Sequence, residues 1–332
     1  MKRYLLLILI LTLIQIMPLL ADGTTATLQQ GDKMTFFTGM SALQQAYEAA
    51  SADGGDVITL SSGEFTAVTT IDKSVRIVGA YGLDPNDSYG TFIAGVVTVS
   101  ADNVKLEGMY FKKDVTLAEI TNCTIKRCWI NNLKQSGTHT NTLIDQCVVI
   151  YDYAIKTGVN YGIKNSTIGG FVGGNTTDIV ANITNCYICL YNYGSTPNIS
   201  QPYAIYKNNV IRLHTTDISA SVSFSAPSEF YNNYFYRTDE SSYSRYVSYS
   251  FVGGCINIGN MSNSSSADRS TFFYPDTTSF QKTGIDDTPV GITGGEGFNK
   301  YPGIPRVLTS TIDAQTDDKG KLNASITVQA EK

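Results

Sequence analysis

Seven short segments with one shared pattern recur along the middle of the chain. Each places a glycine or a side-chain amide between apolar residues. They are LEGMYF from Leu106, ITNCTI from Ile120, IDQCVV from Ile144, IKNSTI from Ile163, ITNCYI from Ile183, YKNNVI from Tyr206 and FYNNYF from Phe230. Their central residues, spaced by 14, 24, 19, 20, 23 and 24, are Gly108, Asn122, Gln146, Asn165, Asn185, Asn208 and Asn232. Apart from the first, these spacings are typical of one coil per repeat in a solenoid.

The repeated central residue has two structural uses in such a coil. Glycine and asparagine tolerate the left-handed backbone conformation of a tight bend. Side-chain amides stacked in register also hydrogen-bond from one coil to the next. We therefore interpret these residues as structural, and we expect Asn165 and Asn185 to lie on neighbouring coils.

The stretch from Ser41 to Gly79 predicts how the solenoid begins. Its first part places four apolar residues on one face of a helix, namely Leu43, Ala46, Tyr47 and Ala50. Ser41 is in the N-cap position, and the DGG sequence at 53–55 supplies the turn that ends the helix. A small helix covers the open apolar end of a solenoid. An ordinary βα unit is the alternative.

This stretch resembles the opening turn of the pectin-lyase-like superfamily of right-handed parallel β-helix proteins. The residues that carry the resemblance are Leu43, Ala46, Ala50, Gly55, Asp56, Ile58, Gly63, Phe65, Lys73, Ser74, Val75, Ile77 and Gly79. The resemblance implies an all-β chain: a single right-handed parallel β-helix (solenoid) of about eight to ten coils. We expect an N-terminal capping helix and a C-terminal β-hairpin. The end of the chain is similar to exported Bacteroidetes β-helix proteins.

The chain is expected to have four parts. Residues 1–21 are predicted to be a signal peptide, because a basic start precedes an apolar run that ends at small Ala21. Residues 22–38 are predicted to be a flexible lead-in and residues 39–305 the parallel β-helix. Residues 306–332 are predicted to form a hairpin that packs on it, because an Asp/Gly turn joins two alternating runs there.

The chain carries few charges. They make up 16% of its residues, against about 25% in an average protein, and the net charge is −5. Only 13 of the 121 residues from Val115 to Phe235 are charged, which a coil stack explains, because like charges on neighbouring coils repel. This composition argues against nucleic acid as a partner, and it supplies no polybasic patch for a membrane surface.

The cysteines are expected to be structural. Cys123, Cys147 and Cys186 follow the central residue of their repeats, so we expect them to stack inside as small buried side chains. A disulfide between Cys123 and Cys147 is the alternative, although parallel Cβ vectors suit it poorly. Cys186 and Cys189 form a C-x-x-C pair, but residues i and i+3 of a strand point to opposite faces. We therefore predict neither a zinc site nor redox chemistry.

Two further groups contain residue types that could bind a metal or act in catalysis. Asp84, Asn86 and Asp87 lie in GLDPNDSYG and offer oxygen ligands for calcium. A plain turn accounts for the same residues, so we predict no cofactor, with calcium as the alternative. The two histidines, His139 and His214, lie in no recognisable catalytic motif.

No catalytic constellation is predicted. The available acids are Glu107, Asp145 and Asp152, and the nearby basic residues, which look scattered, are Lys126, Arg127, Lys164, Lys207 and Arg212. Glu107 and Asp145 share an offset within their repeats, but Thr121 occupies that offset in the coil between them. Hydrolysis of a glycoside needs two carboxylates across one bond.

Tyrosine is abundant in the second half of the solenoid region. Tyr151 and Tyr153 form an i, i+2 pair, and so do Tyr191 and Tyr193. In a strand each pair shares one face, where the rings could stack on sugars. These four are our candidate carbohydrate-binding residues. The alternative is that tyrosine only covers a half-buried sheet, since strands favour it.

The sequence therefore leads to an exported protein, periplasmic, cell-surface or extracellular, that does not insert in a membrane after signal removal. Our first hypothesis is a non-catalytic β-helix that binds polysaccharide or serves as a surface or envelope scaffold. A polysaccharide lyase or glycoside hydrolase is the alternative that the resemblance implies. A structural adhesin without glycan binding is the third. The oligomeric state stays open.

Overall fold

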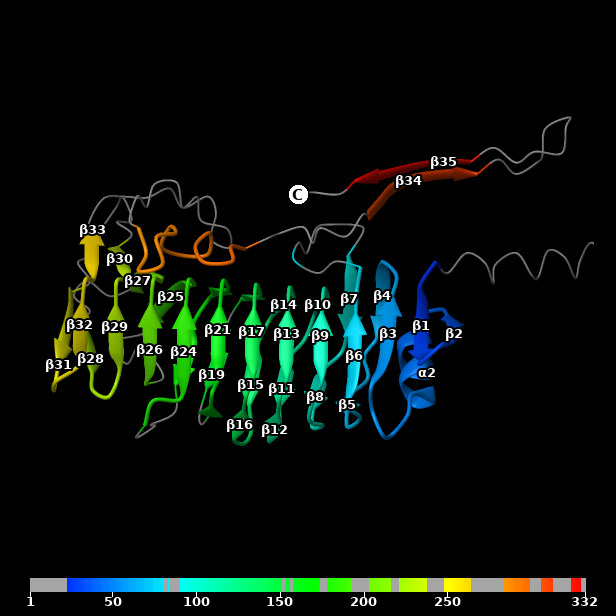
Figure 1. Ribbon diagram of the computed structural model, residues 1–332, viewed down its shortest axis with the longest axis horizontal. Helices are drawn as coiled ribbons and strands as arrows, with labels where there is room; N and C mark the ends of the chain where they lie inside the picture. Colours follow the sequence, from blue (N-terminus) through cyan, green and yellow to red (C-terminus); the bar gives the residue numbers. More distant parts are fainter. Residues whose placement is uncertain are drawn as a thin grey trace, which may run out of the picture. The chain divides into compact units, whose positions relative to one another are not determined.

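The protein is a single parallel β-solenoid with one short N-terminal helix (Figure 1), as expected. The computed structural model describes residues 23–80, 83, 90–150, 153–155, 158–173, 178–192, 203–215, 221–237, 248–263, 283–298, 306–312 and 324–329. Two compact units are present, Met1–Phe298 and Asn299–Lys332. The first contains the solenoid.

Three sheets form the sides of the solenoid. The first sheet consists, in spatial order, of β2 (Lys33–Thr38), β1 (Thr25–Gln30), β3 (Asp56–Leu60), β6 (Val75–Val78), β9 (Lys105–Glu107), β13 (Thr124–Lys126), β17 (Leu143–Asp145), β21 (Gly162–Lys164), β24 (Ala181–Thr184), β26 (Ala204–Lys207), β29 (Glu229–Tyr231) and β32 (Ile256–Ile258). From β3 to β32 every neighbouring pair is parallel. Each such pair therefore marks one turn of the chain around the solenoid.

The second sheet has ten strands and the third has six. The second sheet consists of β4 (Gly63–Thr66), β7 (Thr91–Ala94), β10 (Tyr110–Phe111), β14 (Trp129–Ile130), β18 (Val148–Val149), β22 (Thr167–Ile168), β25 (Tyr187–Asn192), β27 (Val210–Thr215), β30 (Tyr234–Arg237) and β33 (Met261–Asn263). The third consists of β5 (Thr70–Ile71), β8 (Val97–Val99), β11 (Val115–Leu117), β15 (Leu133–Gln135), β19 (Tyr153–Ile155) and β23 (Phe171–Gly173).

The remaining strands form three smaller groups. They are a three-stranded sheet of β12 (Ile120–Thr121), β16 (His139–Thr140) and β20 (Gly158–Val159), the parallel pair β28 (Ser221–Ser225) and β31 (Ser248–Val252), and the antiparallel pair β34 (Arg306–Ile312) and β35 (Ala324–Gln329). The last pair is the predicted C-terminal hairpin and belongs to the second unit. Its packing against the solenoid stays a prediction.

The N-terminal end of the solenoid is closed by α2 (Ala42–Ala49). Its buried face consists of Ala42, Leu43, Ala46 and Tyr47, in agreement with the predicted helical face. Lys73 holds the end of this helix, because its Nζ donates to the carbonyl oxygens of Tyr47, Glu48 and Ala50 at 3.0, 3.1 and 2.8 Å. A cation at a helix C-terminus satisfies carbonyls that lack intrahelical partners. The side chain of Ser41, in contrast, makes no capping hydrogen bond.

The expectation of a flexible lead-in at residues 22–38 is wrong over most of its length. Residues 25–38 form the hairpin of β1 and β2, and β1 pairs antiparallel with β3. Ala26 and Leu28 are buried in the core. The alternation of apolar and polar residues in TATLQQ and KMTFFT, separated by a Gly-containing turn, is the signal that would have predicted it. The placement of residues 1–22 lies outside the described residues.

Two separate corners of the solenoid use residues with left-handed backbone. One corner carries Asn103, Asn122, Asn141 and Asn160, which are evenly spaced along the sequence. The other carries Gly108, Arg127, Gln146, Asn165, Asn185, Asn208, Asn232 and Gly259. The prediction that placed Asn122 between Gly108 and Gln146 is therefore wrong, and Arg127, with φ of 51°, takes that place. Asn165 and Asn185 are on neighbouring coils, since Asn165 N donates to Thr184 O at 3.2 Å.

The core contains an in-register column of side chains, each of which directly follows a residue of the corner that begins at Gly108. Its members are Met109, Cys128, Cys147, Ser166, Cys186, Asn209, Asn233 and Asn260. The Ser166 hydroxyl accepts from Cys147 N at 3.0 Å, and Asn209 Oδ1 accepts from Cys186 N at 2.8 Å. Side chains in this column therefore bind the backbone of the preceding coil.

Candidate functional site

Charged side chains gather on the outer face of the first sheet. Strand pairing puts Glu107, Lys126, Asp145 and Lys164 at one position on four successive strands. The same position continues to Thr184 and Lys207. We call these six residues the charge ladder. Their signs alternate over the first four strands, so that acidic and basic side chains are neighbours along the sheet.

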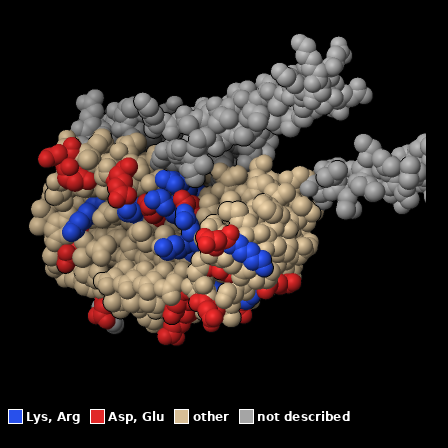
Figure 2. Space-filling model, turned by 45° about the vertical axis from the view of Figure 1, so that its right-hand side comes forward, with Lys and Arg blue, Asp and Glu red and all other residues tan. Residues whose placement is uncertain are grey.

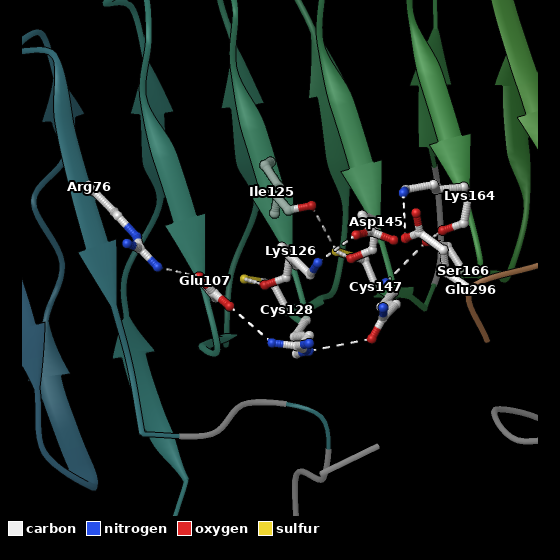
Figure 3. Close-up of polar contacts among 12 residues, drawn as sticks. Arg76, Glu107, Ile125, Lys126, Cys128, Asp145, Cys147, Lys164, Ser166 and Glu296 are labelled. Carbon is white, nitrogen blue, oxygen red and sulfur yellow. Dashed lines mark hydrogen bonds and ion pairs between the residues drawn. The ribbon is translucent and has the colours of Figure 1, made fainter. Parts of the chain in front are cut away.

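Four ion pairs involve the charge ladder, three with residues outside it and one between two of its members (Figure 3). They are Arg76–Glu107 at 3.0 Å, Arg127–Glu107 at 3.1 Å, Lys126–Asp145 at 3.0 Å and Lys164–Glu296 at 2.7 Å. In Figure 2 the acidic and basic side chains on the visible face lie among one another rather than in two patches of single sign. Each acidic member of the ladder therefore has a basic partner.

Asp145 is the buried member of the ladder. The residue is only 1% exposed, and its Oδ2 atom accepts the Lys126 ion pair. Its Oδ1 atom has no hydrogen-bond partner among the described residues. A buried carboxylate depends strongly on the cation beside it, since an isolated buried charge is very unfavourable. Asp145 is thus held out of reach of any large ligand.

A distant segment, residues 283–298, lies across the corner between the first and second sheets; we call it the strap. It is the orange segment above the strands in Figure 1. Asn165 Nδ2 donates to the carbonyl oxygens of Ile292 and Gly294 at 3.1 and 2.6 Å. Asn232 Nδ2 donates to Thr283 O at 3.0 Å. Asparagines of the second corner therefore bind the strap.

Apolar contacts also hold the strap. Val290 and Ile292 are buried in a small cluster with Tyr187, Val210 and Tyr234 of the second sheet. Gly294 has no room for a side chain, because an added Cβ would lie 1.8 Å from Pro289 O and 2.4 Å from Asn185 Nδ2. The strap is thus packed closely against the corner.

An ionic contact adds to these, namely the pair between Lys164 and Glu296. Lys164 donates a hydrogen bond that holds the pKa of Glu296 below its ordinary value of 4.5. Because Glu296 is 66% exposed in its side chain, this ion pair is open to water.

The four candidate tyrosines are not brought together as one described surface. Tyr151 and Tyr193 lie outside the described residues, and no side chain is described for Tyr153 or Tyr191. Tyr153 belongs to β19 in the third sheet, whereas Tyr191 belongs to β25 in the second. The tyrosines whose side chains are described are buried or half-buried, the buried ones being Tyr47, Tyr161, Tyr187, Tyr206 and Tyr234. These tyrosines therefore fit the alternative in which tyrosine covers a half-buried sheet.

All six cysteines are free thiols, so the alternative of a Cys123–Cys147 disulfide is wrong. Cys147 neighbours Cys128 rather than Cys123, because Val148 N donates to Cys128 O at 2.9 Å. Burial raises the pKa of Cys123, Cys128, Cys186 and Cys189 to about 12. Such thiols carry almost no reactive thiolate at neutral pH.

The described part of the chain holds no cluster of side chains that could bind a metal ion. It contains no group of three or more His, Cys, Asp or Glu side chains that could hold a metal ion. Asp84, Asn86 and Asp87, the calcium alternative, lie outside that part. His139 is fully buried, and its Nε2 lies 3.3 Å from Leu117 O.

The charge ladder was not predicted from the sequence. In the predicted repeats Lys126 and Lys164 are scattered, because that alignment places Asn122 at the wrong corner. With Arg127 in its place, Lys126 falls between Glu107 and Asp145 instead of Thr121. The unequal spacings on the two sides of Asn122 were the signal, because the corner that runs from Gly108 through Arg127 to Asn165 is evenly spaced.

Comparison with known proteins identifies one motif. Residues 164–188 match the GLUG motif. This segment spans slightly more than one turn of the solenoid, from Lys164 on β21 to Ile188 on β25, and it includes the corner residues Asn165 and Asn185. No curated protein and no solved structure matches the chain. Among the described residues no helix is long and apolar enough to cross a membrane.

Proposed function

We propose that this protein is an exported, non-catalytic β-solenoid that binds acidic polysaccharide along the outer face of its first sheet. The observation that supports this is the regular placing of lysine in the charge ladder. Lys126, Lys164 and Lys207 occupy one position on every second strand. At about 4.8 Å per strand, they recur at about 9.6 Å, close to the length of two sugar rings.

The charge of the face supports the same ligand. Strands β6 to β29 of this sheet carry five basic side chains, Arg76, Lys105, Lys126, Lys164 and Lys207. They carry three acidic ones, Glu107, Asp145 and Glu229. The excess is positive although the whole chain has a net charge of −5. An extended polyanion is attracted by such a row of cations.

Two of the lysines are open to a ligand. Lys105 and Lys207 make no ion pair with any other residue that the structure describes. Lys207 instead lies 5.4 Å from the centre of the Tyr231 ring. Lys164 has an exposed partner, Glu296, whose carboxylate a sugar carboxylate could replace. Pairs of exposed charges are worth only about 0–1 kcal/mol each, so exchange costs little.

The arrangement of the acids supports binding without cleavage. Asp145 is buried, and both oxygens of Glu107 are held by arginines, Oε2 by Arg76 and Oε1 by Arg127. Neither carboxylate stands free beside a surface where a glycosidic bond would lie. One observation favours the second candidate function, a polysaccharide lyase or glycoside hydrolase. Glu107 and Asp145 are two strands apart, about 9.6 Å, near the upper separation for inverting hydrolases of about 9.5 Å.

Binding is tested with the mature chain on polyuronates, glycosaminoglycans and neutral glucans. We expect binding to the acidic polymers only, weakening as salt is added. The double variant Lys164→Gln, Lys207→Gln, which keeps Lys126 beside the buried Asp145, should weaken it at least tenfold. The matched control is Lys134→Gln, which removes an exposed lysine from the third sheet and should leave binding unchanged. Equal binding by the double variant would overturn the proposal.

The catalytic alternative has its own readout. The same polymers are incubated with the protein, with and without calcium, and followed for unsaturated products and new reducing ends. Turnover that disappears in Glu107→Gln would replace the binding proposal with an enzyme. Unchanged polymers across the panel would count against the enzyme.

We also propose membership of the pectin-lyase-like superfamily and an origin close to the Bacteroidetes proteins that the chain resembles. The solenoid fold and the helix-capped first turn support the first of these. The basic and then apolar start of the chain supports export to the periplasm, the cell surface or the medium. A scaffold or adhesin role without glycan is the outcome if no polysaccharide binds.

A further inference from the structure

Exposed large apolar side chains concentrate at the two ends of the solenoid. The described residues contain nine of them, and six lie at an end. The N-terminal end carries Met34, Phe36 and Met40, and the C-terminal end carries Val252, Ile256 and Ile258. Solenoids usually need polar outer faces on their terminal repeats to stay soluble and separate. Both ends here depart from that rule.

The end strands β2 and β32 are opposite edges of one sheet (Figure 1). β1 is antiparallel to both β2 and β3, so β2 runs in the same direction as β3 and every later strand of the sheet. β32 therefore points the same way as β2. The edge of one copy could add to the opposite edge of another as one more parallel pair, because edge strands present backbone groups ready for pairing.

The side chains of the two edges match in position. On β2, Phe37 and Thr35 pair with the buried Ala26 and Leu28, so Phe36 and Met34 lie on the outer face of the sheet. On β32, Asn257 pairs with the buried Phe230. Ile256 and Ile258 therefore also lie on the outer face. In a shared sheet the exposed Phe36 (70%) and Ile258 (59%) would lie side by side.

The available area fits a reversible contact. At roughly 200 Å² for each large side chain, the exposed parts of these six residues amount to roughly 600 Å². The smallest stable interfaces bury about 1,200 Å² in total, of which somewhat more than half is apolar. Complete burial of these side chains would supply most of the apolar area of a small interface. The two strand edges supply the polar remainder.

We propose that copies of this chain associate end to end, with β2 of one copy pairing with β32 of the next. Such a head-to-tail contact is heterologous, so it leaves one free edge at each end and continues into open chains rather than closing as a dimer. The solenoid then becomes a longer rod with a continuous first sheet.

Light scattering during gel filtration of the mature chain over a range of concentrations tests the proposal. The average mass should rise with concentration and pass beyond that of a dimer. Phe36→Lys and Ile258→Lys should each weaken association at least tenfold, with unchanged melting temperature. The matched controls are Val159→Lys and Ile285→Lys, which alter exposed apolar residues away from both end strands and should associate like the parent chain.

A mixing experiment separates head-to-tail contact from other arrangements. Phe36→Lys keeps an intact β32 edge and Ile258→Lys keeps an intact β2 edge. Each alone should be monomeric, and an equal mixture should form a heterodimer that grows no further. A monomeric parent chain at every concentration would overturn the proposal. Dimers of either variant alone that are as tight as the association of the parent chain would also overturn it, because the altered edge would then not belong to the contact.

Discussion

Asparagine has two distinct roles in this chain, and the difference lies in where the side chain points. At the outer corner, Asn122, Asn141 and Asn160 each donate to the asparagine one coil earlier at 3.0–3.1 Å in the exposed surface. Inside, Asn209 is fully buried and binds backbone as well as side chains. The same residue type therefore supports a bend at the corner and supplies hydrogen bonds inside the core.

His139 gives a prediction about pH at the residue scale. Burial lowers its pKa below the ordinary value of 6.5, so the unfolded chain binds a proton more readily than the folded one. The stability that neutral His139 provides is complete above pH 6.5 and is lost as the pH falls below it. His139→Gln should therefore show a smaller drop in melting temperature between about pH 7.5 and about pH 5.

The control for that measurement is His214→Gln, which changes the only other histidine. Its effect on the pH dependence gives the contribution of the second histidine, with which that of His139 is compared. The same pH dependence in the parent and in His139→Gln would contradict the assignment to His139. The substitution also removes the imidazole ring that stacks on Tyr161, 5.6 Å away between ring centres, so the comparison uses the pH dependence of the melting temperature and not its absolute value.

At the scale of elements, the core column shows how a coil is tied to the one before it. Asn209 Oδ1 accepts from Cys186 N at 2.8 Å, and its Nδ2 donates to Ile183 O at 2.9 Å. In the earlier coils Cys128, Cys147 and Ser166 occupy the same column. The column therefore changes from small, weakly polar side chains to amides as the coils proceed.

Asn209→Ala should destabilise the solenoid by about 2–4 kcal/mol, because it leaves buried backbone groups without partners. Asn141→Gly is the comparison in the exposed corner, where glycine keeps the left-handed bend. It should cost less than about 1 kcal/mol. Urea unfolding followed by the fluorescence of Trp129, the only tryptophan, measures both. Equal losses in the two variants would show that the buried column has no special importance.

The strap is the other element that changes the character of the surface. It brings Glu296 to Lys164 from a distant part of the sequence, and it buries Val290 and Ile292 against the second sheet. Its position next to the charge ladder places an acidic residue at one edge of the proposed binding face.

At the scale of the whole molecule, the free thiols report on how completely the core is closed. Five of the six cysteines are buried and Cys255 is only partly exposed. In the native protein we expect a thiol reagent to modify Cys255 alone. After unfolding without a reducing agent all six should react. Fewer than six would show a disulfide, and rapid reaction of several native thiols would show that the coils open readily.

The sequence by itself determined the fold class, the period of the coil and the helical cap. These depend on local chemistry: apolar residues alternate in short strands, and glycine or asparagine accepts the left-handed bends at regular spacing. Only the tertiary structure decided which bend each residue occupies. Asn122 and Gln146 are both amides followed by cysteine, and local propensity does not distinguish the two corners.

The tertiary structure also decided where the charges meet. Lys126 reaches Asp145 because one full coil returns the chain to the same position on the next strand. Glu296 reaches Lys164 because the strap crosses the corner. Such contacts depend on register and on distant segments, and a shift by a few residues moves every side chain to another neighbour. The physical reason is that a solenoid converts sequence spacing into spatial contact only after its register is fixed.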